Sequence, residues 1–213
     1  MQLPLSVDIV SDVVCPFCYI GLARVEQALE QEGAASATIA FHPFLLDPDT
    51  PPGGEDLRER LRRKYGGDPE AMFGRVEAMA RESGLPLDFA KVRRSASTVG
   101  AHTLLRHAKE RGTQVALARA LFEAYFLEGA DISDVDVLAA LAVRHGFEDV
   151  DARALVVSAS EDAATRAEAA AAAARRGVSG VPLTIFAGEL AVSGAQPVEV
   201  FREAIRRVRA SAP

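Results

Sequence analysis

Apolar and polar positions divide the chain into a beginning with strands and one helix, a helical middle, and an end with strands and one helix. The apolar run at residues 7–14 predicts a buried strand. A helical pattern follows over Pro16–Gln31, where the proline suits the first turn. Residues 37–46 predict a second strand, which ends at the turn-rich sequence DPDTPPGGED. The chain is therefore predicted to begin as β-α-β.

Helical periodicity dominates the middle of the chain. It recurs at residues 56–64, 69–83, 97–111 and 114–127. Ser133 is then the predicted cap of a helix that runs to Arg144. Ser158 and Glu161 have the spacing of a capping box, and they precede an alanine-rich helix that we expect to end at Gly177.

The end of the chain returns to strands. Residues 182–187 and 189–193 are short apolar runs joined by Ala187-Gly188, which predicts a hairpin. A last helix is predicted over residues 197–209. Its expected buried face contains Val200, Phe201, Ala204, Ile205 and Val208.

This order of elements predicts an α/β fold. We expect a thioredoxin-like sheet, β-α-β at the start and β-β-α at the end, with a large inserted all-helical domain. The predicted bounds are residues 1–47 and 177–213 for the thioredoxin-like domain. The inserted helical domain is placed at residues 48–176.

Composition and charge narrow the function classes. The chain has 213 residues and a net charge of −6, which disfavours a general nucleic-acid binder. Its apolar runs are too short to span a membrane, so we expect no membrane partner. The N-terminus has neither a basic region nor a small-residue cleavage site, and we therefore expect a cytoplasmic protein.

Cys15 and Cys18 are the only cysteines, and they stand where the first predicted strand gives way to a helix. A thiol at the start of a helix faces unpaired backbone N–H groups and the positive end of the helix dipole, which favour a thiolate. A second thiol one turn later can attack a mixed disulfide formed at the first. Zinc usually requires four cysteine or histidine ligands and no second CxxC exists, so we expect redox chemistry and no metal.

Two further features carry weaker signals. Asp12 lies three residues before Cys15 and is a candidate proton acceptor for Cys18, although an aspartate there also suits a helix cap or the surface. The basic run RERLRRK at residues 58–64 can meet an acidic ligand such as glutathione, or form a solvated helix face.

Four segments together resemble a known family. They are SDVVCPFCYIG (residues 11–21), EAYFLEGADISD (123–134), GVSGVPLTIF (177–186) and VSGAQPVEVF (192–201). In this order they resemble the cytoplasmic DsbA-family thiol oxidoreductases of the FrnE-like branch. That branch is related to 2-hydroxychromene-2-carboxylate isomerase and to kappa-class glutathione transferase.

The resemblance implies roles for particular residues. It implies that Cys15 attacks the substrate disulfide and that Cys18 resolves the mixed disulfide. It also implies a cis Val181–Pro182 bond beside the two cysteines, whereas the residues alone are also compatible with an ordinary trans turn. Pro16 and Phe17 would tune the redox couple. Phe17 departs from the tryptophan usual in this branch and from the histidine of the periplasmic oxidants, and it either meets substrates or packs.

The leading hypothesis is a thiol–disulfide oxidoreductase that works in the reductase or isomerase direction on disulfide-containing proteins or small thiols. We expect no tightly bound cofactor, with glutathione as a candidate co-substrate. One alternative is a glutathione-dependent isomerase or transferase, although those relatives typically carry serine in place of Cys15. A second alternative is a redox-regulated chaperone-like protein. The sequence leaves the oligomeric state open.

Overall fold

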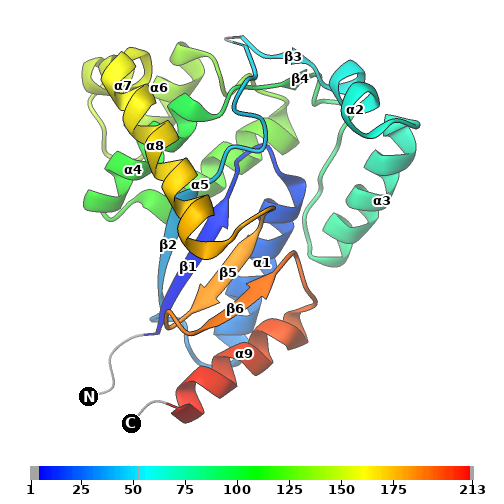
Figure 1. Ribbon diagram of the computed structural model, residues 1–213, viewed down its shortest axis with the longest axis vertical. Coiled ribbons are helices and arrows are strands. Elements are labelled where there is room, and N and C mark those ends of the chain that lie inside the picture. Colours follow the sequence, from blue (N-terminus) through cyan, green and yellow to red (C-terminus); the bar gives the residue numbers. More distant parts are fainter. Residues whose placement is uncertain (1–4, 52, 212–213) are drawn as a thin grey trace.

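A computed structural model describes residues 5–51 and 53–211, without the side chains of Arg175 and Arg176. Its centre is a four-stranded sheet with the strand order β2-β1-β5-β6 (Figure 1). The strands are β1 (Ser6–Ser11), β2 (Thr38–Pro43), β5 (Leu183–Phe186) and β6 (Leu190–Ser193). Strand β1 pairs parallel with β2 and antiparallel with β5, and β5 pairs antiparallel with β6. The strands and helices predicted at the two ends of the chain are confirmed, with bounds that shift for all of them except the first helix.

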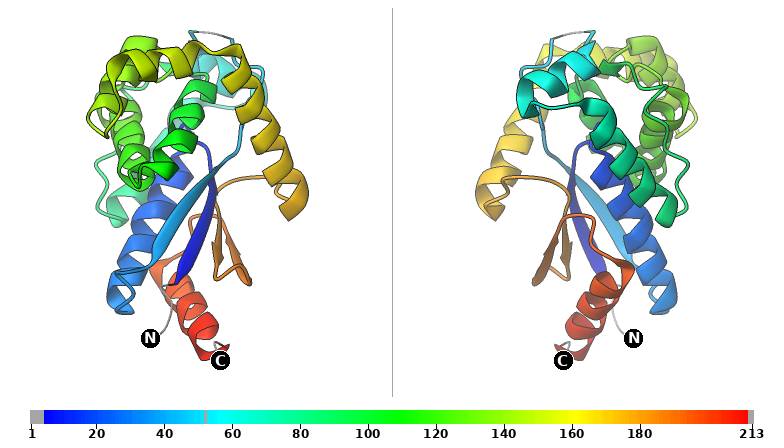
Figure 2. Two further views of the ribbon diagram at one scale, coloured as in Figure 1. Left: turned by 90° about the vertical axis from the view of Figure 1, so that its left-hand side faces the viewer. Right: turned by 90° about the vertical axis from the view of Figure 1, so that its right-hand side faces the viewer.

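Helices cover both faces of the sheet. Figure 2 shows α1 (Pro16–Gln31) on one side of the sheet and α8 (Ala159–Arg176) on the other. The last helix, α9 (Val198–Ser211), packs against α1. Alternate residues of β1, such as Val7 and Ile9, are buried against α1 because side chains alternate across a pleated strand.

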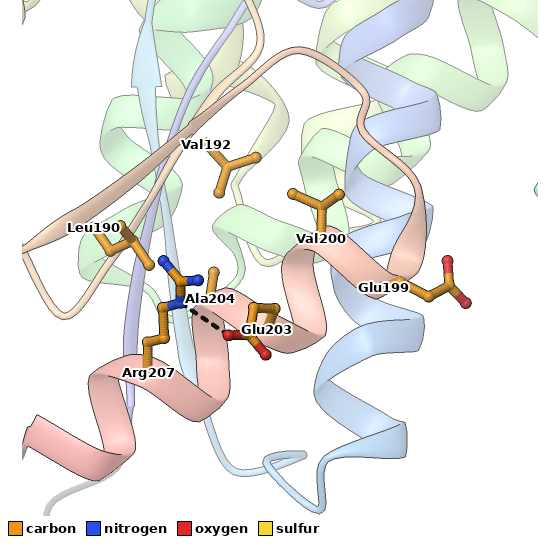
Figure 3. Close-up of a pocket in the computed structure, with 7 residues that line it drawn as sticks. All are labelled: Leu190, Val192, Glu199, Val200, Glu203, Ala204 and Arg207. Carbon is orange, nitrogen blue, oxygen red and sulfur yellow. Dashed lines mark hydrogen bonds and ion pairs between the residues drawn. The ribbon is translucent and has the colours of Figure 1, made fainter.

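The face of α9 differs from the prediction at one position. Phe201, Ala204, Ile205 and Val208 are buried as expected, but Val200 is 41% exposed. Figure 3 shows Val200 at a shallow cavity between β6 and α9, which the ion pair of Glu203 with Arg207 also lines. The apolar stripe of α9 is wider than the sheet edge that covers it, so its margin stays open.

The insertion between β2 and β5 holds most of the helices. They are α2 (Leu57–Tyr65), α3 (Pro69–Glu82), α4 (Val99–Glu110), α5 (Gln114–Glu123), α6 (Val135–Val143), α7 (Asp149–Val157) and α8. A short antiparallel pair, β3 (Glu55–Asp56) with β4 (Arg94–Ser95), adds two strands to a segment expected to be helical throughout. Helices α4, α5 and α8 contact β2, whereas α3 contacts α1. Helix α7 was not anticipated, and the domain bounds at residues 48–176 remain a prediction.

Two helix starts show how local chemistry sets the bounds. Asp134, rather than Ser133, caps α6, because its carboxylate accepts hydrogen bonds from Asp136 N and Val137 N. Ser158 caps α8 as predicted, and its hydroxyl accepts from Glu161 N at 3.3 Å. The Glu161 carboxylate bonds to Arg106 and His107 on α4, and it thereby ties α8 to α4.

The helix predicted at residues 114–127 changes character in its last turn. Helix α5 passes into a π-helical turn, η1 (Ala124–Glu128), which is a form often found near functional sites. Gly129 ends it with φ 71°, and a Cβ there would lie 2.4 Å from the Lys91 carbonyl oxygen. The turn directs Tyr125 and Phe126 into the interior.

Gln114 joins the insertion to the outer strand β2. Its buried amide accepts from Phe41 N at 2.9 Å, and donates to the carbonyls of Phe41 and Leu105 at 3.1 Å each. The Gln114 side chain therefore makes, at one residue of the edge strand β2, the backbone hydrogen bonds that a further strand would make. Among the described helices, none is long and apolar enough to cross a membrane.

Candidate active site

Cys15 lies at the junction between the inner strand β1 and helix α1. It is the N-cap residue of α1, and Pro16 occupies the first helical position. The Cys15 carbonyl accepts from the backbone N–H of Cys18 at 3.0 Å, and Cys15 N donates to the Asp12 carbonyl at 3.0 Å. This turn holds the thiol at the positive end of the helix dipole, a position that favours negative charge.

Cys15 is less exposed than the sequence suggests. Only 4% of the residue is accessible, because its sulfur opens into a cavity and not onto the outer surface. The neighbouring Phe17 is 40% exposed and lines the same cavity. Of the two readings of Phe17, the structure favours an apolar surface beside the thiol over a packed core residue.

Cys18 stands one turn into α1 and is fully buried. Both cysteines are free thiols, and the Cys18 thiol interacts with the Cys15 sulfur. Burial raises the pKa of the Cys18 thiol well above its usual range, and the Cys15 sulfur raises it further. The Ser11 hydroxyl and the Asp12 backbone act in the opposite direction by smaller amounts. Cys18 is therefore held as a thiol at neutral pH, beside the Cys15 sulfur.

The loop before β5 lies against Cys15 and forms part of its surroundings. The Val181–Pro182 peptide bond is cis, as the resemblance implies. The Val181 carbonyl lies 3.8 Å from the Cys15 sulfur and can accept its proton in a hydrogen bond. Pro182 packs directly on α1, since a Cβ at Gly21 would lie 3.2 Å from the proline Cγ. The two segments, more than 160 residues apart, are thus brought together at one sulfur.

Asp12 is buried at the end of β1, and not a surface residue or a helix cap. One carboxylate oxygen accepts from Leu46 N at 2.8 Å, and the other lies 3.4 Å from Nε2 of His102 on α4. Among the described residues, no hydrogen bond joins this carboxylate to Cys18, although the Asp12 backbone lies beside that thiol. Ser11 shares this buried environment, and its hydroxyl has no hydrogen-bond partner among the described residues.

A cavity of about 490 Å³ opens beside Cys15, and we call it the cysteine cavity. Its walls come from the β1–α1 junction, the loop at residues 179–181, helices α2 and α3, and η1. Three aromatic rings form one wall: Phe73 and Phe89 stack with their centroids 4.3 Å apart, and Phe89 meets Phe126 edge-on at 6.0 Å. Its size and apolar lining are typical of small-molecule or side-chain binding.

Sequence reasoning missed several of these residues. His102 carries no signal in the sequence, yet its Nε2 contacts the Asp12 carboxylate from helix α4 of the insertion. Tyr125 and Phe126 fit an ordinary apolar helix face in the sequence, and only the π-helical turn brings them to the cavity. Burial raises the pKa of the Tyr125 hydroxyl, which donates to the Arg94 carbonyl at 2.8 Å. Within the described residues, no group of three or more His, Cys, Asp or Glu could hold a metal ion.

Comparisons with known proteins agree with this geometry. A family model described as the DSBA-like thioredoxin domain matches residues 6–206. A crystal structure of a probable DsbA oxidoreductase from Streptomyces coelicolor is similar, with a TM-score of 0.88 and 32% identity. That alignment covers 98% of this chain and 92% of the other.

Two more distant structures share the fold. The 2-hydroxychromene-2-carboxylate isomerase has a TM-score of 0.72 at 17% identity, over 96% of each chain. The cytosolic disulfide reductase DsbM from Pseudomonas aeruginosa, solved with GSH, has a TM-score of 0.65 at 16% identity. It matches over 96% of this chain and 99% of its own. At these identities the likeness extends to the fold alone.

The raised pKa of Cys18 predicts how stability depends on pH. The unfolded chain releases this proton above about pH 8.5, whereas the folded chain keeps it to higher pH. The stability due to the buried thiol is thus fully present below the unfolded pKa and is lost as pH rises through the folded pKa. We expect the free energy of unfolding of the reduced protein to fall, relative to Cys18→Ala, by about 1.4 kcal/mol per pH unit over that interval. Urea unfolding of both proteins from pH 7 to 10 measures this, and parallel curves would contradict a raised pKa.

Proposed function

The chain belongs to the family of DSBA-like thioredoxin domains, and on that premise we propose that it is a thiol–disulfide oxidoreductase acting through Cys15 and Cys18. The observation that carries the proposal is the position of Cys15. Its sulfur stands at the N-cap of α1, next to Cys18, under the Val181 carbonyl, and opens to a cavity. Members of this family are generally thiol oxidoreductases or isomerases, so the family match by itself supports an enzyme.

The proposed reaction has two exchanges. The Cys15 thiolate attacks one sulfur of a substrate disulfide, forming a mixed disulfide and releasing the first substrate thiolate. The Cys18 thiolate then attacks the Cys15 sulfur, which releases the second substrate thiolate and leaves a Cys15–Cys18 disulfide. The burial of Cys18 supports this order, because a fully buried thiol cannot meet a substrate first. Reduction of the new disulfide by an external thiol completes the cycle.

The loop at Val181 and the exposed Phe17 support the binding of a disulfide substrate. The loop lies alongside Cys15, where an extended substrate segment can hydrogen-bond to backbone groups as an added strand. Phe17 and Pro16 flank the sulfur and offer apolar contact to the group next to the disulfide. The proposed partners are disulfide-containing proteins or small thiols.

Turnover of the cysteine variants tests the core of the proposal. Wild type should accelerate the reduction of insulin and the reactivation of scrambled ribonuclease, whereas Cys15→Ser should fall to the uncatalysed rate because the attacking sulfur is gone. Cys18→Ser should accumulate a mixed disulfide at Cys15, visible by mass spectrometry and lost on reduction. Equal rates for wild type and Cys15→Ser would refute the proposal.

The same variants separate two other functions. The fold likeness to 2-hydroxychromene-2-carboxylate isomerase makes a glutathione-dependent isomerase the second candidate. Isomerisation of such a substrate that survives Cys18→Ala would favour it, because that chemistry needs no resolving thiol. Holding of unfolded clients that persists in Cys15→Ser would favour a chaperone-like role.

We propose a cytoplasmic reductase or isomerase with glutathione as its thiol co-substrate. In a cytosolic glutathione pool the resting enzyme would be mostly dithiol, and it would pass electrons to substrate disulfides. DsbM, a neighbour in fold, is a cytosolic disulfide reductase solved with GSH, which supports this direction. Pro16 and Phe17 occupy the two positions between the cysteines. Neither carries a charge that could strongly stabilise a thiolate at Cys15.

The reduction potential tests the proposed direction. Equilibration of the purified protein with mixtures of reduced and oxidised glutathione should give a potential of about −200 mV or lower. A potential near about −120 mV, the value of a strong periplasmic oxidant, would show that the protein is an oxidase instead.

Asp12 is the proposed proton acceptor in the resolving step. Its buried position in the turn below Cys15, with its backbone beside Cys18, supports the role. Asp12→Asn keeps an oxygen for Leu46 N but removes the base, so release of substrate from the mixed disulfide should slow by about 100-fold relative to the first attack. Quenched-flow measurement of both steps against pH checks this, with Asp8→Asn on the same strand as the matched control. A resolving step within twofold of wild type would remove Asp12 from the mechanism.

A further inference from the structure

Helix α2 forms one wall of the cysteine cavity and carries the basic run at residues 58–64. Most of its cations are already paired with carboxylates. Arg58 binds Glu70 at 2.6 Å. Arg60, which is buried, binds Asp47 at 2.5 Å and lies 3.6 Å from Glu55. Arg63 also binds Glu55, at 2.5 Å.

Lys64 is the cation of α2 that both lines the cysteine cavity and has no carboxylate partner among the described residues. Its ammonium group donates to the Leu46 carbonyl at 3.1 Å and lies 5.7 Å from the centre of the Tyr65 ring. Across the part of the chain that the structure describes, no carboxylate lies within ion-pair distance of it. The charge of Lys64 is therefore compensated only by a carbonyl dipole and a ring face.

The charged residues that line the cysteine cavity are all positive. The described residues that line it include two cations, Arg60 and Lys64, and no aspartate or glutamate. Arg60 is neutralised by Asp47, so Lys64 supplies the net positive charge at this wall. This contrasts with the net charge of −6 for the whole chain. Lys64 itself is exposed at the mouth of the cavity, so water and salt screen its charge, but it remains a positive charge beside an apolar lining that can hold the body of an anionic ligand.

Resting on the proposed function, we propose that Lys64 makes the cysteine cavity selective for low-molecular-weight disulfides that carry a carboxylate on an aromatic or other apolar body. The reacting sulfur would meet Cys15, the body would lie along Phe73 and Phe89, and the carboxylate would reach Lys64. A cavity of about 490 Å³ has room for one such group. The exchange itself is unchanged: Cys15 captures one half of the disulfide, the other half leaves as a thiolate, and Cys18 then releases the captured half.

Two aromatic disulfide probes separate charge from shape. Dithiobis(nitrobenzoate) carries a carboxylate on each ring, dithiodipyridine carries none, and both release a coloured thiol. Stopped-flow absorbance gives the second-order rate constant of the reduced enzyme with each probe. We expect the ratio of the anionic to the neutral rate constant to fall about fivefold in Lys64→Glu, and by a smaller factor in Lys64→Met. The ratio cancels any change in the reactivity of Cys15 itself.

Arg62→Glu is the matched control, because Arg62 is exposed on the same helix, carries the same charge and does not line the cavity. We expect its ratio to stay within twofold of wild type. An unchanged ratio in Lys64→Glu, or an equal fall in Arg62→Glu, would overturn the proposal for Lys64. A wild-type protein that releases thiol from neither probe would instead contradict the proposed oxidoreductase. Circular dichroism of each variant confirms that the fold is retained.

Discussion

The chemistry of this protein depends on the close packing of helix α1 beneath the loop at Val181–Pro182. Gly21 lets the proline approach α1, and the Val181 carbonyl then lies against the Cys15 sulfur at the helix start. Because Cys15 is the N-cap of α1 in the short turn that follows β1, the same contact fixes the helix start and the thiol beside the sheet. A shift of either segment would separate the Cys15 sulfur from the Val181 carbonyl.

Burial makes the two sulfurs differ in access and in proton affinity. Cys15 has access to the cysteine cavity, whereas Cys18 is fully buried and its pKa is raised. In a thioredoxin-like sheet without further domains, a thiol at the position of Cys15 would face open solvent at the start of α1. Here helices α2 and α3 of the insertion stand over it and turn that surface into a cavity with an aromatic wall. The insertion thereby controls which groups can approach Cys15, and Gln114 and His102 attach it to the sheet and to Asp12.

Where the prediction succeeded, the signal was local and strong. Helix α1 has the predicted bounds Pro16–Gln31, and Ser158 caps α8, because proline at a first turn and serine at an N-cap act through neighbouring backbone groups. The errors arose where two signals were equivalent in sequence. Asp134 displaced Ser133 as the cap of α6. The last turn of the helix at residues 114–127 is π-helical and ends at Gly129, which packs against the Lys91 carbonyl.

The sequence by itself determined the pair of thiols, their place at the start of a helix, and the order of strands and helices at the two ends of the chain. These follow from interactions between residues close in the chain, such as side-chain alternation, helix capping and the spacing of Cys15 and Cys18. Only the tertiary structure decided that Cys15 opens to a cavity, that Asp12 is buried against His102, and that Lys64 keeps an unpaired charge there. Each of these depends on segments tens of residues apart meeting in space, and burial, cavity shape and ion pairing are properties of that packing and not of local sequence.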